Sequence, residues 1–248
     1  MLLMPVSQLH QWMPATYLAT YTVQCSLVAW LLWRYRRQLP ELTAAFHWAA
    51  VPVGGAVAFA WIGMGLWMVH TFPDRFALQS TTDDMFAQMG LGLGWSAFLL
   101  RLVGMSVLVP LFEELFVRSL LLRGFSNANT TLLGLTQIVM DMPVIGEWLT
   151  HTRVGHWADH HRPVVFAQVF DRTPLGTLTL FGVAASTVVF TVGHGVRDWP
   201  AAVVCGIAYC LLLAATRHKG LGPVCWAHGI TNAILWGYTL QTNDWQFL

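Results

Sequence analysis

Long apolar stretches restrict the fold of this sequence more than any other feature. Only 10% of the residues are charged and 56% are hydrophobic, whereas soluble domains carry about 25% charged residues. Several stretches reach the roughly 20 residues that an α-helix needs to cross the hydrocarbon core of a bilayer. We therefore expect an all-α fold, a polytopic membrane helical bundle that forms one integral membrane domain over residues 1–248.

The predicted membrane spans are separated by clusters of charged, proline and glycine residues. They are residues 16–33, 45–72, 91–122, 175–194, 200–216 and 223–240. The third span is longer than one straight crossing requires, so we expect Pro110 to bend or break it. Residues 124–174 predict a polar connecting segment that is interfacial or re-entrant. An extra pair of crossings in this segment would raise the number of spans, so the bundle is expected to contain about six to eight transmembrane helices.

The basic residues indicate the orientation of these spans. With Arg34, Arg36 and Arg37 on the cytoplasmic side, most other arginines of the connecting segments fall on that side too, and both termini lie outside. The net charge of +1 gives no basic field for nucleic acid, so no nucleic-acid partner is expected. The expected partners are the lipid bilayer and a membrane-associated protein or peptide substrate.

Three short motifs place ionisable side chains inside apolar stretches. A charge at the centre of a bilayer costs about 2.5 to 3.5 kcal/mol on insertion scales, so several such charges require a shared polar cavity. Cavities of this kind usually carry out chemistry or transport. The motifs are Glu113-Glu114-x-x-x-Arg118, Phe190-x-x-x-His194 and His228-x-x-x-Asn232.

In the first motif the sequence predicts one carboxylate in an ion pair, that of Glu114, and one without a partner in the motif, that of Glu113. Glu114 and Arg118 are four residues apart on one helix and can pair, whereas Glu113 has no partner of its own in the sequence. A free carboxylate in an apolar pocket suits general acid–base chemistry. The alternative for the Glu114–Arg118 pair is an architectural ion pair that holds a bend, and for that pair alone this alternative is favoured.

The other two motifs offer imidazole and amide groups. The Phe190 ring, one turn before His194, can pack beneath its imidazole. His228 and Asn232 share a helix face, which suits an oxyanion site. Peptide hydrolysis needs an activated water and donors for the oxyanion, so Glu113 with His194 would supply the first requirement and His228 with Asn232 the second.

The order and spacing of these motifs, within residues 99–238, resembles the CPBP family of intramembrane endopeptidases. That family contains the type II CAAX prenyl proteases and bacteriocin-processing or immunity proteins. The surrounding stretches agree as well: VPLFEELFVRSLLLR, VVFTVGHG and WAHGITNAILW. The stretch from Pro110 to Arg123 and the ending WGYTLQTNDWQFL also look like the bacterial branch associated with exosortase systems.

The resemblance implies a helical bundle around a polar intramembrane cavity, with a protease-like core over residues 91–240. It implies an endopeptidase of the bacterial inner (cytoplasmic) membrane that cleaves membrane-associated or prenylated proteins or peptides. Its implied catalytic residues are Glu113, His194, His228 and Asn232, with support from Glu114, Arg118 and Phe190.

The motif residues are also compatible with a metal-dependent version of the same protease. Zinc catalytic sites take three protein ligands and a water, and Glu113, His194 and His228 can provide three, although the helical HExxH pattern is absent. We expect metal-free chemistry, with a divalent metal such as zinc as the alternative. The polar segment also contains a possible metal-binding group, which we interpret as a wet interfacial stretch instead: His151, His156, Asp159, His160 and His161.

Two other functions use the same residues. Glutamate, histidine and arginine lining a bundle also form the relay of an ion- or proton-coupled transporter. The sequence lacks the repeat symmetry and paired broken helices of many transporters, which argues against this function. An immunity-type partner protein would keep the fold without turnover, and the intact motifs argue mildly against it.

Overall fold

The computed structural model describes residues 14–76, 85–242 and 244, and these residues form helices joined by loops, with no β-strand among them. The predicted all-α fold is confirmed. Within this part of the chain three helices are long and apolar enough to cross a membrane: Ala50–Thr71, Gly90–Ser126 and Val196–Lys219. The first lies within the predicted span 45–72, and the other two include the predicted spans 91–122 and 200–216. The count of six to eight spans and the enclosed cavity stay predictions.

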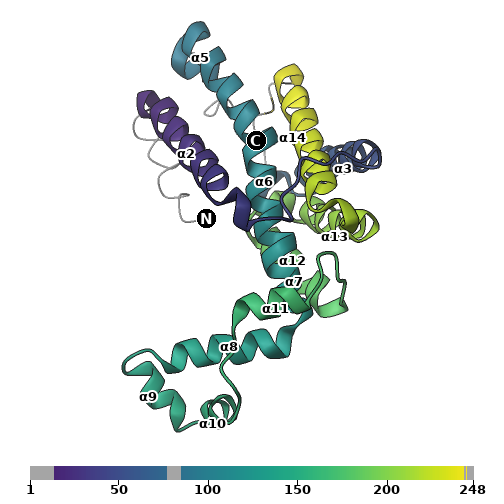
Figure 1. The fold of residues 1–248 in the computed structure, drawn as a ribbon. Coiled ribbons are helices and arrows are strands. Elements are labelled where there is room, and N and C mark those ends of the chain that lie inside the picture. The colour runs from purple at the N-terminus through teal and green to yellow at the C-terminus, as the bar shows by residue number, and fades with distance from the viewer. Residues whose placement is uncertain (1–13, 77–84, 243, 245–248) are drawn as a thin grey trace.

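The remaining predicted spans are also helical. Helix α2 has 22 residues and α14 has 21. Helix α12 has only 13, which is shorter than the roughly 20 residues that a helix needs to cross a bilayer. The helices of the bundle (Figure 1) are α2 (Pro14–Tyr35), α3 (Ala50–Thr71), α5 (Met85–Val103), α6 (Val109–Glu114), α7 (Leu122–Ser126), α12 (Leu180–Val192), α13 (Trp199–Thr216) and α14 (Gly222–Thr242). Short helices flank them: η2 (Arg36–Gln38), α4 (Pro73–Phe76), η5 (Val196–Asp198) and η6 (Arg217–Lys219).

Helices α3, α13 and α14 pack against one another and α12 packs on α13, which forms the core of the bundle. Small residues allow the closest approaches. A side chain at Gly54 of α3 would collide with the Ala227 carbonyl of α14, and one at Gly229 of α14 would collide with the Ser106 carbonyl. Close packing at small residues is the usual way in which apolar helices associate in lipid. The hydrophobic effect does not drive this association, because lipid tails are as apolar as the helix surfaces.

The helix through the first motif is continuous, so Pro110 does not break it, and the bend predicted as the other effect of this proline stays a prediction. Residues Gly90–Ser126 form one helix of 37 residues. Two π-helical turns interrupt its α-helical pattern, η3 (Gly104–Leu108) just before Pro110 and η4 (Leu115–Leu121) just after the two glutamates. Helix α5 has a kink at Gly90, where φ is +71° and where the 37-residue helix begins.

Helix α14 compensates for the N–H that Pro110 lacks. In η3 the Val109 N–H donates to the Gly104 carbonyl, five residues back. The next carbonyl, that of Met105, would pair with residue 110 in this pattern, but proline has no N–H to donate. The Asn232 amide nitrogen donates to the Met105 carbonyl instead, at 2.7 Å. The fold therefore satisfies a backbone group that apolar surroundings would otherwise leave unpaired.

Residues 127–174 form a helical arm that lies beyond the end of α7, outside the bundle (Figure 1). Its helices are α8 (Ala128–Met140), α9 (Ile145–Thr150), α10 (Arg153–Asp159) and α11 (Phe166–Arg172). Gln137 of α8 organises the arm. Its amide nitrogen donates to the Ala158 carbonyl at 3.2 Å, and its amide oxygen accepts from the Val164 N–H at 2.9 Å.

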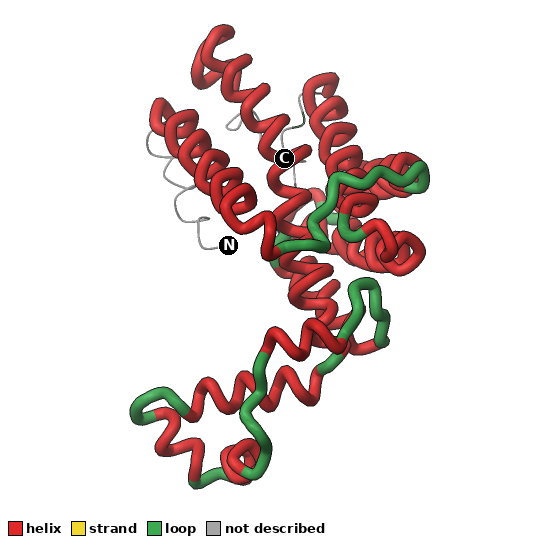
Figure 2. The backbone as a smooth tube through the Cα atoms, in the orientation of Figure 1, coloured by secondary structure: helices red, strands yellow, loops and turns green. Residues whose placement is uncertain are grey.

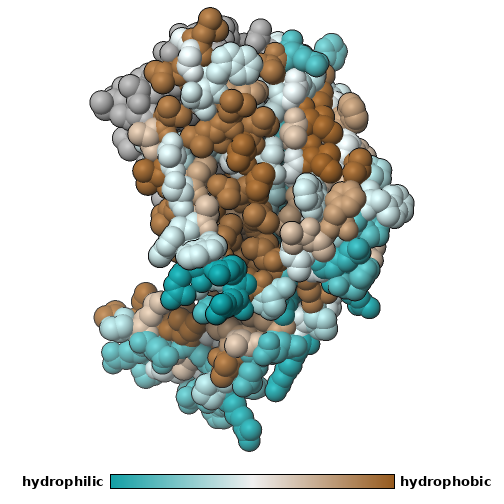
Figure 3. Space-filling view, turned by 45° about the horizontal axis from the view of Figure 1, so that its top comes forward, coloured by the Kyte–Doolittle hydropathy of each residue, from teal (hydrophilic) through white to brown (hydrophobic). Residues whose placement is uncertain are grey.

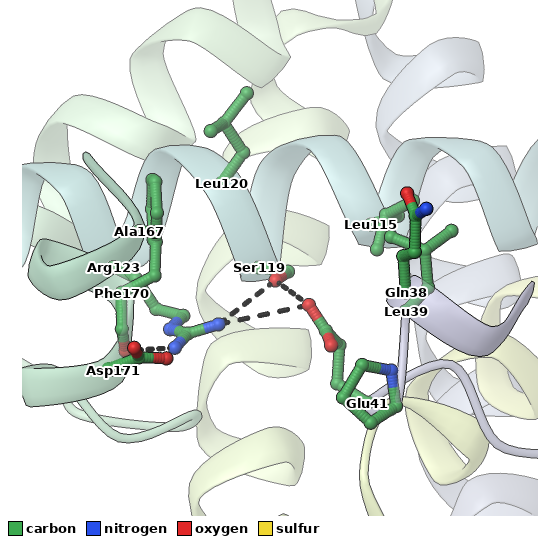
Figure 4. A pocket seen from close by; sticks show the side chains of 11 residues that line it. Gln38, Leu39, Glu41, Leu115, Ser119, Leu120, Arg123, Ala167, Phe170 and Asp171 are labelled. Carbon is green, nitrogen blue, oxygen red and sulfur yellow. Dashed lines mark hydrogen bonds and ion pairs between the residues drawn. The ribbon is translucent and has the colours of Figure 1, made fainter. Parts of the chain in front are cut away.

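Arg123 joins the arm to the bundle. Its Nε donates to the Thr173 carbonyl at 2.8 Å and its Nη2 donates to the Phe170 carbonyl, at the C-terminal end of α11. Its Nη1 lies 3.8 Å from Glu41, which also accepts a 2.6 Å hydrogen bond from Ser119. These groups face a pocket of about 400 Å³ between the loop after η2, the long helix and α11 (Figure 4).

The surface of the bundle is apolar over a broad band, and hydrophilic residues gather below that band and over the arm (Figure 3). In the tube view the arm is seen to be built from short helices joined by loops (Figure 2). This distribution is the one that the membrane interpretation of the sequence requires.

The close approach at Gly229 predicts a substitution effect. Gly229→Ala should lower the free energy of unfolding by about 1 to 3 kcal/mol, because the added methyl group meets the Ser106 backbone. Gly237→Ala on the same helix is the matched control. Its Cβ meets no atom within 4 Å, so it should be neutral or stabilising by up to about 1 kcal/mol. Denaturant titration in mild detergent measures both; equal effects would contradict the packing.

Candidate active site

The carboxylate of Glu114 is the centre of a buried polar cluster. Glu114 is fully buried, with 0% of its surface exposed, and so is Arg118. Arg118 Nε lies 3.1 Å from Glu114 Oε2, and His228 Nδ1 lies 2.8 Å from Glu114 Oε1. The ion pair predicted from the spacing of Glu114 and Arg118 is therefore present. The same carboxylate also holds the histidine of the third motif, 114 positions away in the sequence.

The guanidinium of Arg118 is enclosed by aromatic rings and a backbone carbonyl. Its Cζ lies 5.0 Å from the centre of the Phe190 ring and 5.6 Å from that of Tyr209. Its Nη2 lies 3.5 Å from the Gly206 carbonyl of α13. Aromatic faces attract a cation, most strongly where water is excluded. Arg118 thus connects the long helix to both α12 and α13.

His228 is oriented by its contact with Glu114. A carboxylate can only accept, so Nδ1 of His228 carries the proton that it shares with Glu114 Oε1. The other ring nitrogen, Nε2, points toward Glu113 and lies 3.9 Å from its Oε2. The side chain of Glu113 is 33% exposed, whereas that of His228 is 7% exposed. His228 therefore stands between a buried carboxylate and an accessible one.

A second hydrogen-bonded group fixes the helices around His228. The centre of the Tyr209 ring lies 5.6 Å from that of the imidazole, with the two rings tilted by 42°, and the Tyr209 hydroxyl shares a 2.7 Å hydrogen bond with Thr231. Thr231 also lies 2.8 Å from the Gly54 carbonyl. Because these residues belong to α13, α14 and α3, the contacts tie three helices together one turn from the polar cluster.

His194 lies at the end of α12 and packs between two aromatic rings. The rings of Phe190 and Trp61 lie 4.5 and 5.4 Å from its imidazole. Its Nδ1 donates to the Phe190 carbonyl at 2.8 Å, which leaves Nε2 as an acceptor. The packing of Phe190 on His194 that the spacing predicts is therefore present. Since Phe190 also contacts Arg118, the second motif joins the cluster through this ring.

Sequence reasoning found the motif residues but missed three that surround them. Tyr209 and Thr231 are buried polar residues in apolar helices, a signal that was available in the sequence. Trp61 gave no signal, because it is one of 13 tryptophans. Asn232 lies on the same helix as His228, as predicted, but one N–H of its amide donates to the Met105 carbonyl. Only its second N–H is available for an oxyanion.

The two histidines among the predicted zinc ligands, His194 and His228, make the hydrogen bonds that metal-binding histidines usually make. Metal-binding histidines commonly donate their other ring nitrogen to a carboxylate or carbonyl. His228 does so to Glu114 and His194 to Phe190, so both leave Nε2 for a metal. However, across the part of the chain that the structure describes, no three histidine, cysteine, aspartate or glutamate side chains gather into a ligand set. This also holds for the arm, where His160 and His161 bond to backbone carbonyls.

Glu114 and Arg118 should be energetically coupled. Glu114→Gln and Arg118→Met should each lower the free energy of unfolding by about 3 to 5 kcal/mol, because each removes the oppositely charged partner of a buried charge. The double variant should lose clearly less than the two losses added together. Glu147→Gln, at an exposed glutamate of the arm, should change stability by less than about 0.5 kcal/mol. Strict additivity of the two losses would rule out the coupling.

Comparison of the chain with family models, with curated proteins and with solved structures found no match. The resemblance to the CPBP family therefore depends on the three motifs and their surrounding residues. What the structure adds is the contact between the motifs, since residues from all three belong to one connected cluster around Glu114 and Arg118.

Proposed function

We propose that this chain is an intramembrane endopeptidase of the CPBP type, embedded in a bacterial cytoplasmic membrane by six to eight helices. Its substrates would be membrane-associated proteins or peptides, prenylated or not. The observation that carries the proposal is the position of His228, which donates to the buried Glu114 at 2.8 Å while its Nε2 faces the accessible Glu113 at 3.9 Å. A carboxylate, an oriented imidazole and a second carboxylate are typical parts of a hydrolytic site.

Glu113 acts as the general base in this proposal. Its carboxylate takes a proton from a water molecule as the water oxygen bonds to the substrate carbonyl carbon. The proton then passes from Glu113 to the amide nitrogen as the C–N bond breaks, which releases an amine and a carboxylic acid. The partial exposure of Glu113 supports this role, because the base must meet both water and substrate.

His228 and Asn232 stabilise the tetrahedral oxyanion. His228 can donate to it only when Nε2 also carries a proton, and Glu113 is the nearest carboxylate that can exchange that proton. Glu114 holds the imidazole in place and offsets its charge. Asn232 contributes its second N–H while the first stays with Met105. Donors fixed in advance in this way are worth more than donors that must reorient.

His194 is assigned with Glu113 to the positioning of the attacking water. Its Nδ1 is engaged by the Phe190 carbonyl, so Nε2 is the atom that accepts a hydrogen bond. Phe190 and Trp61 hold the ring on two sides. A fixed acceptor of this kind supports the role, because a water molecule must be held as well as deprotonated.

Glu113→Gln should lower the turnover of a membrane-anchored peptide substrate by about 100- to 10,000-fold, since the amide keeps the shape but cannot accept the proton. The test uses purified chain in lipid nanodiscs, with prenylated and unprenylated substrates and mass-spectrometric detection of cleavage. Glu147→Gln is the matched control and should keep full turnover, because it lies in the exposed part of the arm. Equal turnover of Glu113→Gln and the native chain would refute the assigned base.

The metal-dependent alternative and the transporter make different predictions in the same system. If zinc is bound by Glu113, His194 and His228, chelation should abolish cleavage and added zinc should restore it. Chelation should leave the metal-free enzyme unchanged. A transporter would cleave nothing, and its ion flux in proteoliposomes would depend on Glu113. The buried Glu114–Arg118–His228 group is the observation that keeps the transporter as the second candidate.

A further inference from the structure

The arm presents an apolar edge that nothing else in the described chain covers. On α8 one face packs inward through Leu133, Gly134 and Gln137. The opposite face is apolar and exposed, which is the reverse of the usual arrangement in a water-soluble helix. It carries Leu132, Leu135 and Ile138, which are 55%, 49% and 47% exposed, and Met142 in the turn just after the helix is 45% exposed.

A strained turn extends this edge at the tip of the arm. The Ile145 N–H donates to the Pro143 carbonyl at 2.8 Å, which forms a γ-turn around Val144. Val144 has φ +67° and ψ −57°, a conformation that is rare for a β-branched residue. The side chain that this turn displays is 80% exposed, and Ile145 and Trp148 beside it are 53% and 68% exposed. The backbone is therefore strained at Val144, and the apolar side chains at this turn are exposed.

The arm lies where a bilayer surface is expected. It begins directly after Ser126, the last residue of the 37-residue membrane-crossing helix. Helix α8 runs crosswise to that helix (Figure 1). A helix in this position, with an apolar face and with an exposed tryptophan in the short helix α9 that follows it, has the properties of a segment that lies in the interfacial layer of a membrane.

We propose that the apolar edge of the arm, residues 132–148, docks into the interfacial layer of the same bilayer that holds the bundle. Lipid covers this edge by hydrophobic contact. Charge contributes little, since residues 127–174 carry three arginines against four acidic residues. Docking therefore requires no anionic lipid. The inference depends on the membrane location proposed above, and proteolytic activity has no part in it.

The test measures the depth of single labels in the full chain. Cys25 is replaced by serine, because the other cysteines are buried. Single cysteines at Ile138 and Ile145 carry a fluorophore whose emission is quenched by spin-labelled lipid in nanodiscs that hold one chain each. Gln168→Cys, exposed on the polar side of the arm, is the matched control. Val188→Cys, 59% exposed on α12, is the reference for lipid contact.

Ile138 and Ile145 labels should be quenched several times more strongly than the Gln168 label, and equally in neutral and anionic nanodiscs. Strong quenching at Val188 with none at Ile138 and Ile145 would overturn the docking while leaving the membrane location intact. Quenching of the Ile138 and Ile145 labels that appears only with anionic lipid would also overturn the docking. So would quenching of these labels that appears only when a disc holds two chains or when a soluble partner is added. Absence of quenching at all four positions would overturn the membrane location as well.

Discussion

The organisation of this protein depends on one buried carboxylate. Glu114 is inaccessible to solvent and touches the arginine of its own helix and the histidine of α14. Isolated charges of this kind are costly in apolar surroundings, so each of the three groups requires the others. The requirement has a structural consequence, because it joins the long helix to α14 through His228 and to α12 and α13 through Arg118. A cluster that keeps the fold together also sets the position of the accessible carboxylate beside it.

Backbone irregularity is concentrated around the same residues. Two π-helical turns flank the pair of glutamates, and the turn on one side contains the carbonyl that Asn232 caps. π-turns inside α-helices often mark functional sites, because they rotate the following side chains relative to a regular helix. Here the irregular turn and the proline are stabilised from outside, by α14. The position of Glu113 relative to His228 thus depends on contacts between helices as well as on the helix that carries it.

The sequence predicted the helical class, the three helices that are long and apolar enough to cross a membrane, and the Glu114–Arg118 pair, because periodicity and i, i+4 spacing are local properties. It left open a break at Pro110 that the structure does not show, since the group that replaces the missing N–H comes from residue 232 and cannot be predicted from local sequence. The partnership of His228 with Glu114 was missed for the same reason. Sequence spacing had linked His228 to Asn232 on one helix, and the structure adds a partner on another helix.

The amino-acid sequence by itself determined that this chain must bury long apolar helices and that a few ionisable side chains must share their interior. Composition and spacing suffice for this, because the cost of placing a charge in an apolar medium does not depend on the fold. Only the tertiary structure decided which charge meets which partner. It placed one imidazole between two neighbouring carboxylates and left Glu113 accessible while it buried Glu114. Adjacent residues on a helix point about 100° apart, so the packing of α14 against one of them is what separates their roles.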